Sequence, residues 1–309
     1  MRFGVPDAKL EKWMIDRRVD VLAAEGIEFQ YNADIGGSGM SVDDLRDQFQ
    51  AVVVATGSRV ARDLEVPGRD LDGVHDAMDY LYQRNRYVAS ISGGPAGPEP
   101  EVVISAEGKD VIVIGGGDTG MDCISNANRE GARSTLLLDV YPEVPKDGRY
   151  PDTPWPLPLK RSYTTYALDE GGERRFGHQV VELREGDDGR VGELIGRRVT
   201  GSSSRTLEPV EGSEYSLPAQ LVLIAVGFTG PEQEGLLDGL GVELDNRGNV
   251  HAPAFASTEN GIFAAGDARV GQSLIVTAIA EGRRCARVVD RFLKDADPVT
   301  AVDLPIVPS

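Results

Sequence analysis

Four short stretches of continuously apolar residues divide the chain, and each is closely followed by a glycine. They cover residues 51–55, 111–114, 221–226 and 262–265. Runs of this length without polar alternation are typical of parallel strands that are buried on both faces. We therefore predict an α/β fold with doubly wound parallel sheets, in which ligands bind outside the carboxyl ends of the strands.

Apolar residues at helical spacing predict three helices. One pattern spans residues 6–26, one runs from the glycine-rich sequence after the second apolar stretch towards Gly131, and one covers about 273–293. Residues 134–139 are predicted as a further buried strand, and residues 27–31 alternate like a short strand.

Weakly alternating segments continue to about residue 215 and predict an antiparallel flap. Two stretches rich in proline and glycine, residues 91–100 and 142–158, are predicted as loops. The first of them is a candidate connection between domains, since the length of the chain favours about two domains.

Composition excludes several classes of function. The 309 residues include 50 acidic and 32 basic ones, a formal net charge of −18, whereas nucleic acids and anionic membranes need basic patches. Two cysteines, Cys123 and Cys285, and three scattered histidines predict neither a disulfide framework nor a metal site. The charged N-terminal residues and the lack of an apolar run of about 18 residues predict a cytoplasmic protein without a signal peptide.

The candidate chemistry lies in the sequence Gly-Gly-Gly-Asp-Thr-Gly, directly after the second apolar stretch. A G-x-G-x-x-G spacing between a strand and a helix is typical of a dinucleotide-binding β–α–β unit. Gly115 would allow the tight turn, Gly117 would let backbone N–H groups approach a pyrophosphate, and Gly120 would let helix and strand pack closely. Asp118 and Thr119 complete the candidate loop. The alternative is a glycine turn that binds no ligand.

Asp139 ends the next strand, 19 residues beyond Gly120, where an acid that binds the adenosine ribose is expected. Its carboxylate would repel the 2′-phosphate of NADPH by up to about 4 kcal/mol, at about 4 Å and an effective dielectric constant of about 20. No arginine is expected nearby to receive that phosphate, because the next basic residues are Lys146 and Arg149. We therefore predict NADH as the cofactor and NADPH as the weaker one. The alternative is that Asp139 is a solvated strand end.

A series of short motifs runs through nearly the whole chain in a fixed order. They are Arg2-Phe3-Gly4-Val5-Pro6-Asp7, Lys9-Leu10-Glu11-Lys12, Val54-Ala55-Thr56-Gly57, Val66-Pro67-Gly68, Gly115 to Cys123, Pro154-Trp155-Pro156, Ala225-Val226-Gly227-Phe228, Phe263-Ala264-Ala265-Gly266-Asp267, Gly271-Gln272-Ser273-Leu274 and Ala278-Ile279-Ala280-Glu281-Gly282-Arg283. Together they resemble the small (β) subunit of glutamate synthase, a flavin-dependent pyridine-nucleotide oxidoreductase. The Pro154-Trp155-Pro156 loop and Asp139 resemble the NADH-type branch, since the NADPH-type carries paired arginines near that strand end.

This resemblance implies two nested, Rossmann-like dinucleotide-binding domains. The inner, NAD(P)H-binding domain would span residues 106–228. The outer, FAD-type domain would be split into a first segment with a linker, 1–105, and a second segment, 229–309. The family begins with an iron–sulfur segment and a further G-x-G-x-x-G for FAD, and this sequence contains neither. The outer domain is therefore expected to be incomplete at its N-terminus, in an N-terminally truncated chain.

The resemblance also implies candidate cofactor-binding residues beyond the glycine-rich loop. In the family, a turn lies beside FAD, an acid binds the flavin ribityl chain, and a helix N-terminus points at the flavin ring. The alternatives are a turn that simply ends a strand and residues that cap helices. The matching positions here are Thr56, Gly57, Gly227, Gly266, Asp267, Ser273, Thr277 and Ala278.

The family passes a hydride from NAD(P)H to FAD and then electrons to a large subunit that makes L-glutamate from glutamine and 2-oxoglutarate. An NAD(P)H-dependent oxidoreductase of this type is expected, with the large subunit or another acceptor protein as partner. No catalytic side chain is predicted, because hydride transfer requires positioning rather than an acid or base. Two alternatives stay open: a nucleotide-binding remnant without redox activity, and a related flavoprotein reductase that serves another acceptor such as ferredoxin.

Overall fold

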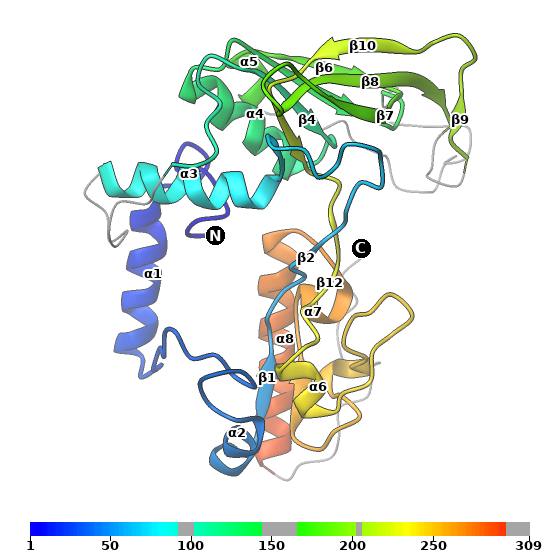
Figure 1. Ribbon diagram of the computed structural model, residues 1–309. Coiled ribbons are helices and arrows are strands. Elements are labelled where there is room, and N and C mark those ends of the chain that lie inside the picture. Colours follow the sequence, from blue (N-terminus) through cyan, green and yellow to red (C-terminus); the bar gives the residue numbers. More distant parts are fainter. Residues whose placement is uncertain (92–101, 144–165, 202–205, 295–309) are drawn as a thin grey trace. The chain divides into compact units, whose positions relative to one another are not determined.

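The computed structural model describes residues 1–91, 102–143, 166–201 and 206–294 (Figure 1). The chain forms two compact units, each assembled from two segments. The first unit combines Met1–Gly26 with Asp63–Gly227, and the second combines Ile27–Arg62 with Phe228–Ser309. The path of the chain thus alternates between the two units, whereas the resemblance implies an uninterrupted inner domain within a split outer one.

The first unit is built on a parallel sheet of five strands in the order β3-β11-β4-β5-β6. Every neighbouring pair in this sheet is parallel. The central strands are buried on both faces, as their uninterrupted apolar sequence predicts. The strands are β3 (Val74–Asp76), β4 (Asp110–Ile114), β5 (Ser134–Asp139), β6 (Glu173–Phe176) and β11 (Leu221–Ile224).

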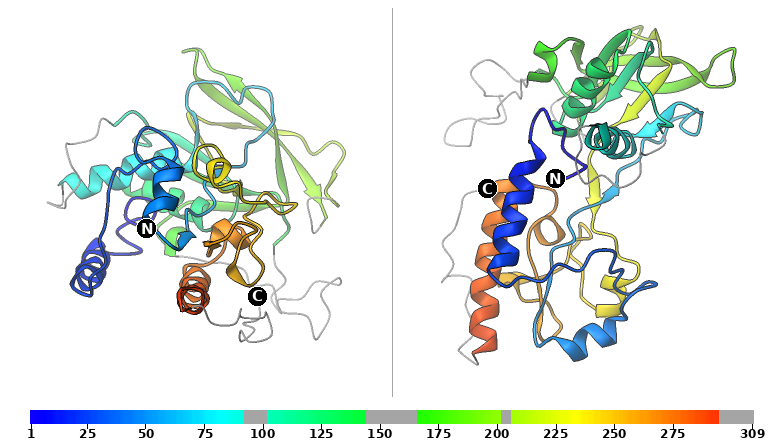
Figure 2. Two further views of the ribbon diagram at one scale, coloured as in Figure 1. Left: turned by 90° about the horizontal axis from the view of Figure 1, so that it is seen from below. Right: turned by 90° about the vertical axis from the view of Figure 1, so that its left-hand side faces the viewer.

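Different layers cover the two faces of this sheet, and they can be followed in Figures 1 and 2. Helices α3 (Ala77–Ile91) and α4 (Asp118–Glu130) pack on one face, where Tyr80 and Ile124 are fully buried. The other face packs on an antiparallel sheet through residues such as Leu194. That sheet confirms the expected flap and consists of β7 (His178–Glu185), β8 (Val191–Thr200), β9 (Glu208–Pro209) and β10 (Tyr215–Pro218).

The N-terminal segment of the chain also belongs to the first unit. The side-chain amide of Asn85, on α3, donates a hydrogen bond of 2.8 Å to the carbonyl of Phe3. Helix α1 (Lys12–Ala24) follows and buries none of its residues. Met1–Gly26 and the segment from Asp63 thus group with the five-stranded parallel sheet, whereas the expected boundary assigned residues 1–105 to the FAD-type domain. The reason is that β3 pairs with β11 and α3 packs on the sheet.

In the second unit, β1 (Val52–Val54) and β13 (Ile262–Ala264) form a parallel pair, and β2 (Val60–Ala61) and β12 (Phe228–Gly230) form an antiparallel pair. The long helix α8 (Ile275–Leu293) packs on β13 through Cys285 and Val288. A second apolar cluster joins Val54 to Leu240. The smaller elements are α2 (Val42–Gln48), α6 (Leu236–Leu240), η1 (Pro253–Phe255) and α7 (Asp267–Val270); α5 (Tyr166–Asp169) belongs to the first unit.

The α/β class and all four apolar strands are confirmed, but several details differ from the sequence prediction. Residues 27–31 form no strand, and the first helix begins at Lys12 rather than near Pro6. Helix α3 has no counterpart in the prediction. The predicted loops at 91–100 and 142–158 lie almost wholly outside the described residues. Within the described part of the chain, no helix is long and apolar enough to cross a membrane.

Candidate functional site

The glycine-rich loop connects β4 to α4 and is shaped by two close backbone approaches. Gly115 has a φ of +116°, and a Cβ atom there would lie 2.3 Å from the carbonyl oxygen of Ala225. A Cβ atom at Gly120 would lie 2.1 Å from the carbonyl oxygen of Gly115. Both positions therefore require glycine for steric reasons, in agreement with a tight turn and close packing of helix on strand.

Gly117 differs from these two glycines because a Cβ atom there would meet no atom within 4 Å. It is the N-cap of α4, and no side chain caps this helix end. Asp118 and Thr119 form the first turn of the helix, and the side chain of Asp118 is half exposed. The loop thus presents open space beside uncapped backbone N–H groups, which is the arrangement that binds phosphate at a helix N-terminus.

Asp139 lies directly against this loop and is buried. Its Oδ2 atom accepts a 2.7 Å hydrogen bond from Arg174, and its Oδ1 atom accepts one of 3.0 Å from the backbone N–H of Tyr141. A Cβ atom at Gly116 would lie 2.0 Å from Oδ2 of Asp139, so the middle glycine makes room for the carboxylate. Asp139 is therefore not a solvated strand end.

The prediction that no arginine accompanies Asp139 considered only neighbours in the sequence and is wrong in space. Arg174 follows 35 residues later on β6, which pairs in parallel with β5. Its guanidinium also donates to the carbonyl of Gly116 at 3.2 Å and lies 4.3 Å from the ring centroid of Phe176. Only the pairing of the two strands brings this residue to the site, and no local sequence signal indicates it.

Lys9 is a second charged group that was not singled out from the sequence. Its Nζ atom lies 2.9 Å from a carboxylate oxygen of Asp122 and 3.4 Å from one of Asp118, both in the first turns of α4. Burial opposes the charged form of Lys9, but the hydrogen bond and the charge of Asp122, helped by Asp118, raise its pKa above the ordinary value. Lys9 belongs to one of the motifs that carry the family resemblance, and that motif is the sequence signal that could have indicated Lys9 as a site residue.

The residues that follow β11 also lie beside the glycine-rich loop. Ala225 donates its N–H to the carbonyl of Ile114 at 2.8 Å, so the chain beyond β11 runs beside the start of the glycine-rich loop. Gly227 follows with a φ of +92° and is the last residue of the first unit. Of the predicted residues, Gly115, Gly117, Asp118, Thr119, Gly120, Asp139 and Gly227 thus all lie in the first unit, at or just beyond the carboxyl ends of parallel strands.

The other predicted residues gather in the second unit, at the carboxyl ends of β1 and β13. Thr56 and Gly57 follow β1, and Gly57 has a φ of +81° with open space around a Cβ position. Gly266 follows β13 with a φ of +67°, and a Cβ atom there would lie 3.7 Å from the Cβ of Ala278. Since β1 and β13 are parallel neighbours, these turns share one edge of the pair.

Asp267 and Ser273 are joined directly in the same region. The hydroxyl of Ser273 donates a 2.7 Å hydrogen bond to Oδ1 of Asp267, which is the first residue of α7. Helix α8 begins after Leu274, which has no capping side chain, so Ser273 is not the cap of this helix. Thr277 is exposed in the first turn of α8.

Both cysteines are buried packing residues. Burial raises the pKa of the Cys123 thiol well above its ordinary value and that of Cys285 to about 11. Such thiols are poor nucleophiles at neutral pH. Among the residues that the structure describes, no group of three or more His, Cys, Asp or Glu could hold a metal ion.

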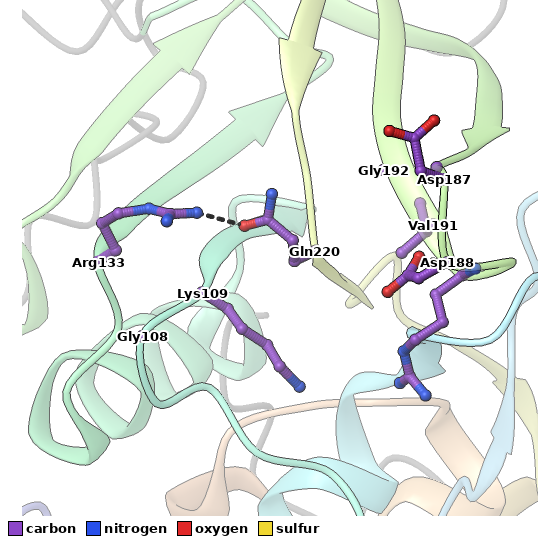
Figure 3. Close-up of a pocket in the computed structure, with 10 residues that line it drawn as sticks. Gly108, Lys109, Arg133, Asp187, Asp188, Val191, Gly192 and Gln220 are labelled. Atoms are coloured by element: carbon purple, nitrogen blue, oxygen red, sulfur yellow. Dashed lines mark hydrogen bonds between the residues drawn. The ribbon is translucent and has the colours of Figure 1, made fainter.

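A pocket of about 430 Å³ lies at the opposite, amino-terminal ends of the strands and contains none of the predicted site residues (Figure 3). Arg133 and Lys109 line one side of it, and Asp187 and Asp188 line the other. Its two arginines already have partners, since Arg133 donates to Asp110 and Gln220 and Arg190 donates to Asp72. The pocket is therefore distinct from the candidate dinucleotide site.

The parallel sheet and the glycine-rich loop between β4 and α4 are typical of Rossmann-type dinucleotide-binding proteins. The chain belongs to the pyridine nucleotide-disulphide oxidoreductase family, which residues 12–282 match. Over its whole length it is 42% identical to the glutamate synthase (NADPH) small chain of Mycobacterium tuberculosis strain H37Rv, of which it covers 62%. It is 39% identical to the small chain of Bacillus subtilis, with 95% of this chain and 60% of that protein aligned. These matches confirm the resemblance, and the chain spans about three fifths of the small chains it matches.

Two further comparisons bear on the fold and the cofactor. Glutamate synthase (NADH) of Schizosaccharomyces pombe is 36% identical over 94% of this chain, which covers 14% of that protein. Relatives are thus named for both nicotinamide cofactors. FprA from Mycobacterium tuberculosis shares the fold with a TM-score of 0.69 at 16% identity, over 95% of this chain and 75% of FprA.

Proposed function

We propose that this chain is the NAD(P)H-oxidising electron-transfer part of a glutamate synthase small subunit in the cytoplasm. It would bind NADH in the first unit and pass its electrons, through FAD, to a large subunit that makes L-glutamate from glutamine and 2-oxoglutarate. The observation that carries the proposal is the glycine-rich loop, which is sterically closed at Gly115 and Gly120 but open at Gly117. It occurs in a chain aligned over its whole length with small chains of glutamate synthase.

The residues of the first unit fit a bound dinucleotide. The uncapped N-terminus of α4 would hold the pyrophosphate through backbone N–H groups and the helix dipole. Asp139, fixed against Gly116, would accept a hydrogen bond from the ribose. This carboxylate supports NADH as a cofactor, and its pairing with Arg174 lessens its repulsion of the 2′-phosphate of NADPH. Holding the nicotinamide in a fixed place is the contribution that hydride transfer requires of the protein.

The residues of the second unit fit part of a flavin site. Gly57 and Gly266 provide turns with positive φ at the carboxyl ends of neighbouring parallel strands, and the Ser273 hydroxyl orients Asp267. The uncapped start of α8 would offer partial positive charge to an anionic reduced flavin. Bound FAD would accept a hydride and release single electrons. The acceptor of those electrons would be the large subunit or another protein.

The experiment is a titration of the purified chain with NADH by calorimetry, followed by NADH-dependent reduction of a dye after FAD is added. Gly117→Ala should keep the fold and lose NADH binding, because its Cβ would occupy the phosphate position. Gly282→Ala is the matched control, since a Cβ atom there also meets nothing within 4 Å. If the wild-type chain does not bind NADH, the proposal is contradicted. Binding without any dye reduction would favour a nucleotide-binding module without redox activity.

A further inference from the structure

We propose that Arg174 sets how strongly this site discriminates between NADH and NADPH. The guanidinium neutralises Asp139 and supplies a donor for a 2′-phosphate, so the site accepts NADPH as a second cofactor. The inference rests on the proposed function, because it assumes that the adenosine of the dinucleotide lies beside Asp139.

The Asp139–Arg174 pair is built into the unit rather than formed at its surface. The two side chains are 12% and 11% exposed, respectively, and their charged atoms lie 2.7 Å apart. Arg174 is also held by the carbonyl of Gly116 and by the ring of Phe176. A charged pair that is buried and hydrogen-bonded in this way keeps a fixed geometry, because removing either partner would leave an uncompensated charge.

The pair also lies where a ribose substituent would reach it. A Cβ atom at Gly116 would lie 2.0 Å from Oδ2 of Asp139 and 2.6 Å from Nη2 of Arg174. Both charged groups therefore lie against the middle of the glycine-rich loop. A pyrophosphate bound at the next residue, Gly117, would bring the adenosine ribose to this place. The 2′ position of that ribose would then face a carboxylate and a guanidinium together.

The two charges have opposite consequences for the two cofactors. An isolated Asp139 would accept a hydrogen bond from the 2′-hydroxyl of NADH and repel the 2′-phosphate of NADPH. With Arg174 beside it, the net charge of the pair is zero and the repulsion is largely cancelled. A planar guanidinium is in addition the side chain best suited to bind a phosphate. The site is therefore expected to prefer NADH only weakly.

The neighbouring residue provides a matched control. Arg175 is on the same strand but pairs with Glu173 instead, at 2.7 Å, and is more exposed than Arg174. Replacing Arg175 removes the same charge from the unit without disturbing Asp139. A general electrostatic effect on phosphate binding would appear in both variants, whereas a specific contact would appear only at Arg174.

The test is calorimetric binding of NADH, NADPH and the adenosine fragments ADP and 2′,5′-ADP to the full chain. Arg174→Gln should weaken binding of NADPH and 2′,5′-ADP by about tenfold to a hundredfold, the range for a hydrogen bond to a charged group. NADH and ADP should change by less than about threefold. Asp139→Asn should shift the preference towards NADPH, and Arg175→Gln should leave the ratio of affinities unchanged.

The inference is overturned if Arg174→Gln lowers the NADH and NADPH affinities by the same factor or leaves their ratio unchanged. Arg174→Lys keeps the positive charge but loses the planar guanidinium, so it should weaken NADPH and 2′,5′-ADP more than NADH and ADP, which decides the question if the Gln variant does not fold. Failure of the wild type to bind any of the four ligands would contradict the proposed function instead. Because the fragments bind without FAD, neither result depends on flavin reduction.

Discussion

The two units cover their parallel strands to very different extents. In the first unit, the apolar residues of β4 and β11 are buried between helices and an antiparallel sheet. In the second unit, Val53 in the middle of β1 is 43% exposed, beside an apolar groove lined by α8. A strand pair with an open apolar face has little stability of its own, because its side chains are packed on one side only. The glycine-rich loop of the first unit is thus supported by a closed core, whereas the turns of the second unit rest on a partly open one.

The largest expected effect comes from matched valine substitutions in the two strands. Val113 is fully buried in β4, and Val113→Ala should lower the free energy of unfolding of the first unit by about 2.5 kcal/mol through lost burial and a cavity. Val53→Ala, at the middle of β1, should cost less than about 0.5 kcal/mol. Hydrogen exchange resolved by peptide segment would measure each unit separately. Equal costs would contradict the contrast between the units.

A smaller effect is expected at the glycine-rich loop. Gly120→Ala places a Cβ atom 2.1 Å from a backbone carbonyl and should destabilise the first unit by about 2 kcal/mol. Gly117→Ala has extended backbone and open space, and it should cost no more than about 1 kcal/mol, because alanine is a poorer N-cap than glycine. Chemical denaturation of both variants would distinguish a steric role from a ligand-binding role. A large loss of stability in Gly117→Ala would argue against an open phosphate position.

In the second unit, a local effect is expected at the start of α2. The Ser41 hydroxyl accepts a 3.0 Å hydrogen bond from the backbone N–H of Asp44 and caps the helix. Ser41→Ala should cost the second unit about 1 kcal/mol. Ser38→Ala is the control, since its backbone N–H bond to Asp34 does not depend on the Ser38 side chain. The measurement is hydrogen exchange in residues 42–48, which should be faster only in Ser41→Ala.

The smallest effect concerns the pH dependence of the first unit. Burial lowers the pKa of His75 below its ordinary value of 6.5, so the folded unit favours the neutral ring. This contribution to stability is fully present above about pH 6.5 and is lost as the pH falls through the folded pKa. His75→Gln should therefore lose less stability between pH 7 and pH 5 than the wild type. Denaturation curves at pH 8, 7, 6 and 5 would show it, and parallel pH profiles would contradict it.

The sequence indicated the strands and the loop well because their signals are local. Continuous apolar runs and closely spaced glycines correspond directly to buried parallel strands and to turns that exclude a Cβ atom. The strand predicted at residues 27–31 is wrong because alternation alone does not supply a partner strand. The apolar side chains of Ile27, Phe29 and Tyr31 are exposed there instead of packing on a core. Arg174 could not be found in this way, since its place beside Asp139 depends on the pairing of β5 with β6. The net charge at Asp139 thus depends on which strands pair in the sheet, and not on the residues near it in the sequence.

The central claim is that the first unit binds a nicotinamide dinucleotide at the glycine-rich loop. Hydrogen exchange of the chain with and without saturating NADH tests it most directly, because the readout is resolved by segment and needs no flavin. We expect slower exchange in residues 114–121 and 138–141, and we expect this protection to disappear in Gly117→Ala. Unchanged exchange in these two segments at saturating NADH, or protection that persists in Gly117→Ala, would contradict the account.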